Sequence, residues 1–275
     1  MDGDVRSARK AAVLGSPIAH SRSPQLHLAA YRALGLTDWT YERIECDGER
    51  LPGLVSGLGP EWVGLSVTMP GKIAALDFAT ERTERAVTIG SANTLVRIEG
   101  GWRADCTDVD GVRGALTAGG IGTIAGADAV VVGAGGTARP ALVALADMGV
   151  KSVTVVARNE GRAAGALACA EAIGLEVRLL GFDSRELAAR CAGAAALVST
   201  VPSAAIIDCA DVLGQAPFVL DAIYDPWPTP LAAAVEAAGG TVVGGLSMLL
   251  HQAFGQVEQF TGRPAPREAM VAALG

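Results

Sequence analysis

The chain has 275 residues and is 50% hydrophobic, so it is long enough for two domains of ordinary size with filled cores. Its 29 acidic side chains outnumber the 22 Lys and Arg, and the net charge of −7 argues against a general surface for nucleic acid or anionic membranes. Residues 1–10 are charged and lack the apolar stretch of a signal peptide, and no apolar run reaches the roughly 18 residues of a membrane span. We therefore expect a cytoplasmic protein.

The cysteines and histidines give no sign of a disulfide framework or a metal centre. The five cysteines are scattered without a C-x-x-C pair, and the three histidines lack the spacing of metal ligands. Scattered cysteines of this kind are typical of reduced, mostly buried residues in a cytosolic protein. We expect no bound metal.

The first part of the chain alternates predicted strands with predicted helices. Ser23 and Pro24 form a capping and first-turn pair for a helix over 23–35, and a proline begins a second helix over 70–79. The Gly-Gly pair at 100–101 predicts a short hairpin. The predicted strands of this part are 11–14, 40–46, 63–68, 94–98 and 102–105.

After a linking helix over 110–119, strands and helices alternate again. The predicted strands of this second part are 129–132, 152–156, 176–180, 195–199, 218–220 and 241–243. Such alternation predicts a parallel sheet covered on both faces, which is a doubly wound Rossmann-type domain. Two last helices, over 246–260 and from about 265, have no strand partners, so we expect them to pack back on the first domain.

Residues 129–139 read as a buried strand, a glycine turn and the start of a helix. Gly133 permits the tight turn, Gly135 lets the backbone approach a pyrophosphate, and Ala138 is small enough for close packing of helix on strand. The amide groups at the start of the helix would face the diphosphate. Glycine turns without a ligand are common, but the elements on both sides favour a dinucleotide site formed by Gly133, Ala134, Gly135, Gly136, Thr137 and Ala138.

The end of the next strand decides which nicotinamide cofactor is expected. An NAD site usually places Asp or Glu there, about 20 residues beyond the glycines, to bind the ribose 2′-hydroxyl. This chain has Ala157, Arg158 and Asn159, with Arg162 close behind. Two guanidinium groups without a carboxylate fit a 2′-phosphate and would favour NADP over NAD roughly ten- to a hundredfold. The alternative is a pair of ordinary solvated arginines.

Four motifs outside the glycine turn carry polar residues that turns alone do not require. They lie at 15–24 (GSPIAHSRSP), 66–72 (SVTMPGK), 90–94 (GSANT) and 105–111 (DCTDVDG). With these motifs in this order, and with the segments 221–226 and 245–252, the chain resembles the shikimate dehydrogenases over essentially its whole length. The resemblance implies that the chain reduces a small molecule, 3-dehydroshikimate, to shikimate with NADPH.

The resemblance also implies roles for individual residues. Lys72 and Asp108 match the catalytic pair, in which the ammonium gives a proton to the developing alkoxide or stabilises it, and the carboxylate keeps the lysine charged and aimed. The residues that would bind or line the substrate site are Ser21, Ser23, Thr68, Asn93, Tyr224 and Gln252. Thr200 and Gly245 join the cofactor-binding set.

Several of these residues also have ordinary structural explanations. Ser21 and Ser23 suit turn or N-cap positions, Asn93 suits a turn, and Tyr224 suits simple packing. Lys72 suits a solvated position at the start of a helix. A lysine in the first helical turn is unfavourable against the helix dipole, however, which supports a functional reason for it.

Three positions depart from the usual pattern of the family. Ser66 and Cys106 stand where Asn is usual, and Gly71 replaces a bulky residue before the lysine. A serine or a thiol offers less hydrogen bonding than an amide, so the polar contacts of the substrate site and the loop around Asp108 are expected to change. Gly71 is expected to give its turn more freedom. Both members of the catalytic pair are retained.

These observations predict an α/β protein of two domains. Residues 1–109, joined by 246–275, form the substrate-binding and catalytic domain, and residues 110–245 form the NADP-binding Rossmann domain. Two alternatives stay open, namely a quinate/shikimate dehydrogenase of the same fold and a non-catalytic NADP-binding sensor. The chain is expected to act as a monomer or a homodimer, with no nucleic-acid or membrane partner.

Overall fold

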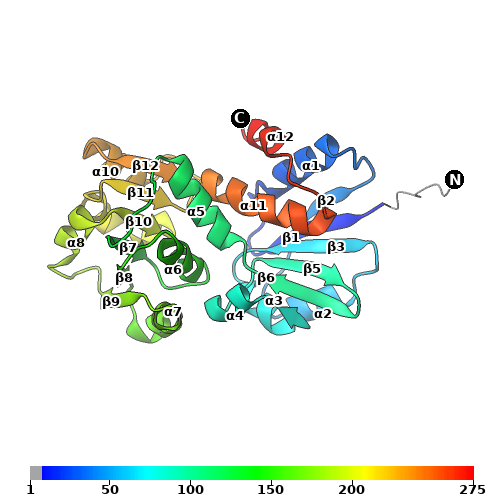
Figure 1. Ribbon diagram of the computed structural model, residues 1–275, viewed down its shortest axis with the longest axis horizontal. Coiled ribbons are helices and arrows are strands. Elements are labelled where there is room, and N and C mark those ends of the chain that lie inside the picture. Colours follow the sequence, from blue (N-terminus) through cyan, green and yellow to red (C-terminus); the bar gives the residue numbers. More distant parts are fainter. Residues whose placement is uncertain (1–7) are drawn as a thin grey trace. The chain divides into compact units, whose positions relative to one another are not determined.

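The computed structural model describes residues 8–275, which fold as two compact units (Figure 1). Of the described residues, the first unit contains 8–87, Ser91–Thr107 and Ala253–Gly275, and the second contains Thr88–Gly90 and Asp108–Gln252. Each unit has its own sheet of six strands, which confirms the predicted α/β class. Within the described chain, none of the helices is long and apolar enough to span a bilayer.

A mixed sheet forms the centre of the first unit. Its strands are β1 (Lys10–Gly15), β2 (Thr40–Glu45), β3 (Trp62–Val67), β4 (Glu81–Arg82), β5 (Thr94–Ile98) and β6 (Gly101–Asp105). The spatial order is β2-β1-β3-β5-β6-β4, with β1 parallel to β2 and β3, and β5 antiparallel to β3 and β6. The carboxyl ends of β1, β3 and β6 and the start of β5 therefore lie at one edge of this sheet.

Helices and turns of the first unit agree in part with the sequence pattern. The hairpin of β5 and β6 is confirmed, and Gly100 takes a φ of +78° in its turn. The helix predicted over 70–79 begins only at Lys72, because Gly71 N still donates to Thr68 O (2.9 Å) in the turn before it. The helices that lie wholly or mostly in this unit are α1 (Ser23–Ala33), α2 (Leu51–Ser56), α3 (Lys72–Phe78), α4 (Glu84–Ile89) and α12 (Arg267–Ala272).

The end of the chain packs on the first unit, as predicted. Arg263 Nη1 donates to Leu34 O (3.1 Å), and the Gln25 amide donates to Ala273 O, so α12 lies beside α1. Phe260, in the second half of α11 (Gly245–Thr261), covers Gly64 of β3 and joins a buried cluster with Tyr31 and Tyr41.

The second unit is built on a fully parallel sheet. Its strands are β7 (Asp128–Val132), β8 (Ser152–Val156), β9 (Glu176–Leu180), β10 (Ala196–Ser199), β11 (Phe218–Asp221) and β12 (Thr241–Gly244). The spatial order is β12-β11-β10-β7-β8-β9, and every neighbouring pair is parallel. The chain first moves outward from β7 to β9 and then returns to β10 on the other side, so the strand order reverses between β7 and β10. This is the predicted doubly wound topology.

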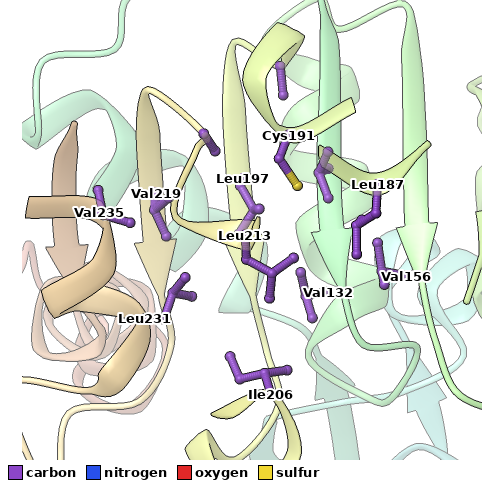
Figure 2. Close-up of a cluster of buried hydrophobic side chains, with 13 residues drawn as sticks. Val132, Val156, Leu187, Cys191, Leu197, Ile206, Leu213, Val219, Leu231 and Val235 are labelled. Carbon is purple, nitrogen blue, oxygen red and sulfur yellow. The ribbon is translucent and has the colours of Figure 1, made fainter. Parts of the chain in front are cut away.

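Helices and a buried apolar layer complete the second unit. Figure 2 shows side chains from β7, β8, β10 and β11 meeting Leu187, Cys191, Leu213, Leu231 and Val235 from the neighbouring helices. These residues are at most 2% exposed, so they hold the strand ends firmly in place. The helices of this unit are α5 (Asp108–Ala118), α6 (Ala138–Asp147), α7 (Glu160–Ala172), α8 (Leu187–Gly193), α9 (Ala210–Leu213) and α10 (Pro230–Ala237), with short 3₁₀ turns at Ser203–Ala205 and Ile207–Cys209.

Three segments group differently from the sequence assignment. Residues 88–90 and 108–109, which the sequence pattern places in the first domain, belong to the second unit. The sequence pattern places residues 246–252 in the returning segment, yet they too belong to the second unit. The reason is close packing on α5, where Gly111 and Gly114 have no side chains. A Cβ on Gly111 would lie 2.8 Å from Met248 O, and one on Gly114 would strike the His251 ring. The start of α11 therefore stays with α5, and only its residues from Ala253 onward belong to the first unit.

Candidate active site

A cavity of about 570 Å³ opens at the carboxyl ends of β7, β8 and β10, where the strand order of the second unit reverses. Doubly wound sheets bind nucleotides at this position. Of the predicted cofactor residues, the wall of the cavity contains Gly133, Ala134, Gly135, Ala157, Arg158, Asn159 and Arg162. Gly136, Thr137, Ala138, Thr200 and Gly245 lie outside that wall.

The glycine turn is held by its backbone and by a threonine. Gly133 has a φ of +105°, a region that residues with a Cβ rarely adopt, and its N–H donates to Val156 O (2.8 Å). Thr200 Oγ1 donates to Val132 O (2.9 Å) and would lie 2.5 Å from a Cβ on Gly133. Thr200 therefore braces the turn. The helix predicted from about Gly136 starts at Ala138, since residues 136–137 still belong to the turn.

The two arginines at the end of β8 are available to an anion. Arg158 and Arg162 are both exposed, and neither forms an ion pair with any residue of the described chain. Asn159 is the N-cap of α7, and its Oδ1 accepts from Arg162 N (3.0 Å). The side chain of Asn159 thus fixes the start of α7 and with it the backbone of Arg162.

In the first unit, Asn93 lies at the sheet edge where β3 ends and β5 begins. Its Oδ1 accepts hydrogen bonds from Thr94 Oγ1 (2.8 Å), Thr107 N (2.8 Å) and Thr107 Oγ1 (3.2 Å), and its Nδ2 donates to Thr107 Oγ1 (3.0 Å). Asn93 is 2% exposed, and Thr94 and Thr107 are fully buried. The residue is therefore more than a turn former, because its amide is oriented by neighbours on both sides.

A buried polar network continues from Asn93 into the first unit. Gln256 Nε2 donates to Asn93 O (3.1 Å) and Thr94 Oγ1 (3.0 Å), while Gln256 Oε1 accepts from Ser66 Oγ (2.7 Å). Tyr41 Oη donates to Ser66 Oγ (2.6 Å). We call this network the strand-end cluster and define it as His27, Tyr41, Ser66, Asn93, Thr94, Thr107 and Gln256.

The serines of the first motif are placed differently from the capping prediction. Arg22 occupies the N-cap position of α1 without a side-chain cap bond, so the prediction of a cap by Ser23 is wrong. Ser23 is 3% exposed, and its hydroxyl instead hydrogen-bonds Tyr41, whose pKa is raised by burial and partly lowered by Ser66 and Ser23. Ser21 Oγ accepts from Ser23 N (3.3 Å), and Arg43 Nη2 donates to Ser21 O (2.6 Å).

Lys72 is the first residue of α3 and is 8% exposed, so it is not an ordinary solvated lysine. Its carbonyl accepts from Ala92 N (2.9 Å), which ties the start of α3 to the residue before Asn93. Thr68 N donates to Leu14 O (2.8 Å) at the end of β3. Thr68, Lys72 and Asn93 therefore lie at the same edge of the first sheet.

The turn before Lys72 has apolar side chains packed close to its glycine. Gly71 has a φ of −78°, and a Cβ there would lie 3.0 Å from Val67 Cγ1 and 3.3 Å from Leu51 Cδ1. Neighbouring apolar side chains therefore leave little room for a larger residue there, and the extra freedom of this turn stays a prediction.

Asp108 begins α5 with its side chain buried (5% exposed), at the end of a helix that favours negative charge. The loop before it is fixed by Asp105, whose Oδ1 accepts from Cys106 N (2.8 Å), and by Asn93, which accepts from Thr107 N. Burial opposes the charge of Asp105, but Arg85, with Nε and Nη2 at 2.6 and 2.5 Å, outweighs it and lowers the pKa of this carboxyl to about 2. Cys106 itself is fully buried.

The other predicted residues belong to the second unit. Tyr224 lies in the loop after β11, where the buried Asp221 accepts from Ile223 N (3.2 Å) and Thr229 Oγ1 (2.7 Å) and so orders the loop. Gly245 N donates to Ile223 O (3.3 Å). Gln252 is 6% exposed, and its Nε2 donates to Leu249 O (2.8 Å).

Comparison with known proteins agrees with this geometry. Residues 13–95 match the family model of the shikimate dehydrogenase substrate binding domain, and residues 245–274 match that of the shikimate 5′-dehydrogenase C-terminal domain. The chain is 38% identical to the shikimate dehydrogenase (NADP(+)) of Halobacterium salinarum, over 95% of this chain and 97% of the relative. The chain belongs to the shikimate dehydrogenase family.

Solved structures of the family have the same fold. The crystal structure of Mycobacterium tuberculosis shikimate dehydrogenase is 63% identical, with a TM-score of 0.91 over 97% of this chain and 98% of that one. The Thermus thermophilus shikimate 5-dehydrogenase in complex with NADP(H) and shikimate is 31% identical, with a TM-score of 0.80 over 96% and 98% of the two chains. The pentafunctional AROM polypeptide of Candida tropicalis is 32% identical over 96% of this chain, which spans 18% of that relative.

Within this shikimate dehydrogenase fold, sequence reasoning missed Gln256, His27 and Tyr41. Gln256 is 1% exposed and holds Ser66 and Asn93 from a distant part of the chain. Its only sequence signal is the four-residue spacing from Gln252, which places two amides on one face of α11. For His27 and Tyr41, the sequence shows only the pattern of a helix and of a strand, and neither pattern indicates a buried polar network.

Proposed function

We infer that this protein is an NADP-dependent shikimate dehydrogenase that catalyses the reversible reduction of 3-dehydroshikimate to shikimate with NADPH, a step of chorismate and aromatic amino-acid biosynthesis. The observation that carries this inference is the presence, in one chain of the family, of an arginine-lined nucleotide cavity and a buried lysine beside a polar strand-end cluster. The near full-length similarity to shikimate dehydrogenases supports it.

The cavity of the second unit suits NADP. The glycine turn of Gly133 and Gly135 provides backbone N–H groups for the pyrophosphate, and the start of α6 adds the positive end of its dipole. Arg158 and Arg162 lie where the adenosine 2′-phosphate is expected, with no carboxylate at the end of β8 to repel it. When bound, the reduced nicotinamide supplies the hydride.

Lys72 and Asp108 are proposed as the catalytic pair. Reduction of a ketone needs a proton for the developing alkoxide, and a buried ammonium can donate it without a metal. Burial disfavours a lone charge, so both residues need charged or polar neighbours to stay ionised. Asp108 is proposed to keep Lys72 protonated and directed at the substrate oxygen.

The substrate carboxylate and hydroxyls are proposed to bind at the same edge of the first sheet. Ser21 and Ser23 provide hydroxyl donors for the carboxylate, and Thr68 and Asn93 face the ring hydroxyls. Because the oxygen of Asn93 already accepts from Thr94 and Thr107, its amide can act on a substrate hydroxyl only as a donor. Tyr224 and Gln252 of the second unit complete the proposed set.

A spectrophotometric assay tests the proposal. Oxidation of shikimate is followed with NADP⁺ and with NAD⁺, and the two reactions are repeated with quinate. We expect turnover of shikimate with NADP⁺ preferred at least roughly tenfold over NAD⁺. Comparable turnover of quinate would favour the quinate/shikimate alternative, and binding of NADP⁺ without turnover of either substrate would favour the sensor.

The cellular setting follows from the same proposal. A cytoplasmic location stays our prediction. A monomer or a homodimer stays our prediction for the assembly, and sedimentation of the purified protein distinguishes the two.

A further inference from the structure

The strand-end cluster contains one residue, Gln256, that lies within hydrogen-bonding distance of four of the other six. Gln256 lies in the second half of α11, yet its amide reaches the ends of two strands. It donates twice, to Asn93 O and Thr94 Oγ1, and accepts from Ser66 Oγ. His27 Nε2 lies 3.3 Å from the same Gln256 Oε1. All capacities of this buried amide are therefore used within the first unit.

The directions of these hydrogen bonds are fixed. Tyr41 Oη donates to Ser66 Oγ, so the Ser66 proton points to Gln256 Oε1. His27 is completely buried, and desolvation lowers its pKa to about 3, so the ring is neutral near pH 7. Two donors toward Oε1 leave only one orientation for the amide, with Nε2 facing Asn93 O and Thr94 Oγ1.

That orientation determines how Thr94 acts on Asn93. Since Thr94 Oγ1 accepts from Gln256 Nε2 at 3.0 Å, its own proton is directed to Asn93 Oδ1 at 2.8 Å. The Asn93 backbone carbonyl is held by the same amide. Gln256 thus constrains both the backbone and the side chain of Asn93.

We propose that Gln256 is a positioning residue for shikimate binding, acting through Thr94 and Asn93 without touching the substrate. This inference rests on the proposed function, because it assigns the Asn93 amide to a substrate hydroxyl. It also explains how Ser66 is accommodated: the short hydroxyl at that position is reached by the long glutamine side chain from α11.

Glutamine differs from methionine and glutamate, which are of similar size, in the hydrogen bonds that its side chain can form. Methionine in place of Gln256 keeps the volume but removes both donors and the acceptor, which leaves Ser66, Thr94 and the Asn93 carbonyl without this partner. Glutamate keeps the acceptor, but when protonated it donates to only one of the two acceptors that Nε2 serves. The loss is therefore expected to be graded, largest for methionine and smaller for glutamate.

The experiment compares Gln256→Met, Gln256→Glu and a control, Glu258→Gln, which changes an exposed side chain of the same helix. Steady-state kinetics give KM for shikimate and for NADP⁺, and ¹H–¹⁵N spectra follow the Asn93 side-chain amide, assigned by its loss in Asn93→Ala. We expect KM for shikimate to rise about tenfold in Gln256→Met and about threefold in Gln256→Glu, with KM for NADP⁺ unchanged. The Asn93 amide resonances shift in both variants and stay in place in the control.

A double variant tests the route of the effect. In an Asn93→Ala background, Gln256→Met is expected to add less than about twofold to KM for shikimate, because its partner is already gone. Full additivity of the two changes, or an Asn93 amide unmoved in both Gln256 variants, would overturn the inference. If Gln256→Met does not fold, Gln256→Glu decides by the same criteria. Absence of shikimate turnover in the unmodified protein would instead refute the proposed function, while the spectra would still decide the positioning role.

Discussion

The two candidate binding regions of this chain differ in the groups that form them. The strand-end cluster of the first unit consists of buried side chains that hydrogen-bond one another, and Ser66, Asn93 and Gln256 are each at most 4% exposed. The nucleotide cavity of the second unit is formed by a glycine turn and by exposed arginines. One region is held rigidly by tertiary contacts, and the other by the local path of the backbone.

This difference suits the two proposed ligands. A small polyol with several hydroxyls needs donors and acceptors fixed in direction, which only a packed network provides. A dinucleotide is long and carries charge at its phosphates, so backbone N–H groups and mobile guanidinium groups suffice. Substitutions should therefore act differently in the two regions.

The largest effect is expected for the proton donor. Lys72→Met should lower kcat for shikimate oxidation at least about a hundredfold, because the buried ammonium is lost at the proposed site of proton transfer. The Kd for NADP⁺, measured by fluorescence titration, should stay unchanged. Lys151→Met is the matched control, since this lysine is exposed and pairs with Glu176 at 3.7 Å on the second unit. Equal turnover in both variants would contradict the assignment of Lys72 as the proton donor.

The next effect concerns cofactor choice. In Arg158→Gln/Arg162→Gln, the ratio of kcat/KM for NADP⁺ over NAD⁺ should fall ten- to a hundredfold, because two charge-assisted contacts to the 2′-phosphate are lost. Turnover with NAD⁺ should change little. Arg178→Gln serves as the control, since it removes an exposed arginine that pairs with Glu186 instead. An equal fall of kcat/KM with both cofactors would mean that the arginines do not bind the 2′-phosphate.

Substitutions at two neighbouring glycines are expected to separate an effect on stability from an effect on NADP⁺ binding. Gly133→Ala should destabilise the protein by about 1–2 kcal/mol or more, because an alanine is strained at a φ of +105° and its Cβ meets Thr200. Gly135→Ala should leave the Tm unchanged, since nothing lies within 4 Å of a Cβ there. It should nevertheless weaken NADP⁺ binding about tenfold if the pyrophosphate approaches this residue. Thermal melts with and without NADP⁺ separate the two, and equal Tm losses would contradict this division.

The smallest effect at neutral pH is expected for His27, and its effect on the free energy of unfolding increases as the pH falls. Burial lowers the pKa of His27 from 6.5 to about 3, so below pH 6.5 the unfolded chain binds a proton that the folded chain does not. Titration of His27 therefore leaves the free energy of unfolding unchanged above pH 6.5. Below that pH the free energy of unfolding falls by about 1.4 kcal/mol per pH unit for this group, until the pH approaches 3. His27→Gln, which does not titrate, should show a weaker loss in urea unfolding between pH 7 and 5. The same slope in both proteins would exclude His27 as the source.

The strand-end cluster shows why part of the site escaped prediction. Gln256 meets His27, Ser66 and Asn93 across sequence separations of 229, 190 and 163 residues. Nothing in the local sequence of α11 distinguishes a glutamine that enters such a network from one on the surface. The wrong prediction of a cap at Ser23 has the same origin, because its hydroxyl hydrogen-bonds Tyr41 of β2.

The sequence by itself determined the features that are encoded locally. A buried strand followed by a glycine turn and a helix has one common backbone path, so the cavity lined by Gly133, Gly135, Arg158 and Arg162 lies where the pattern of residues 129–162 places it. Only the tertiary structure decided which polar side chains meet in the first unit and where α11 passes from one unit to the other. The physical reason is that a turn is set by the dihedral angles of adjacent residues, whereas a buried hydrogen bond forms only after distant segments have packed.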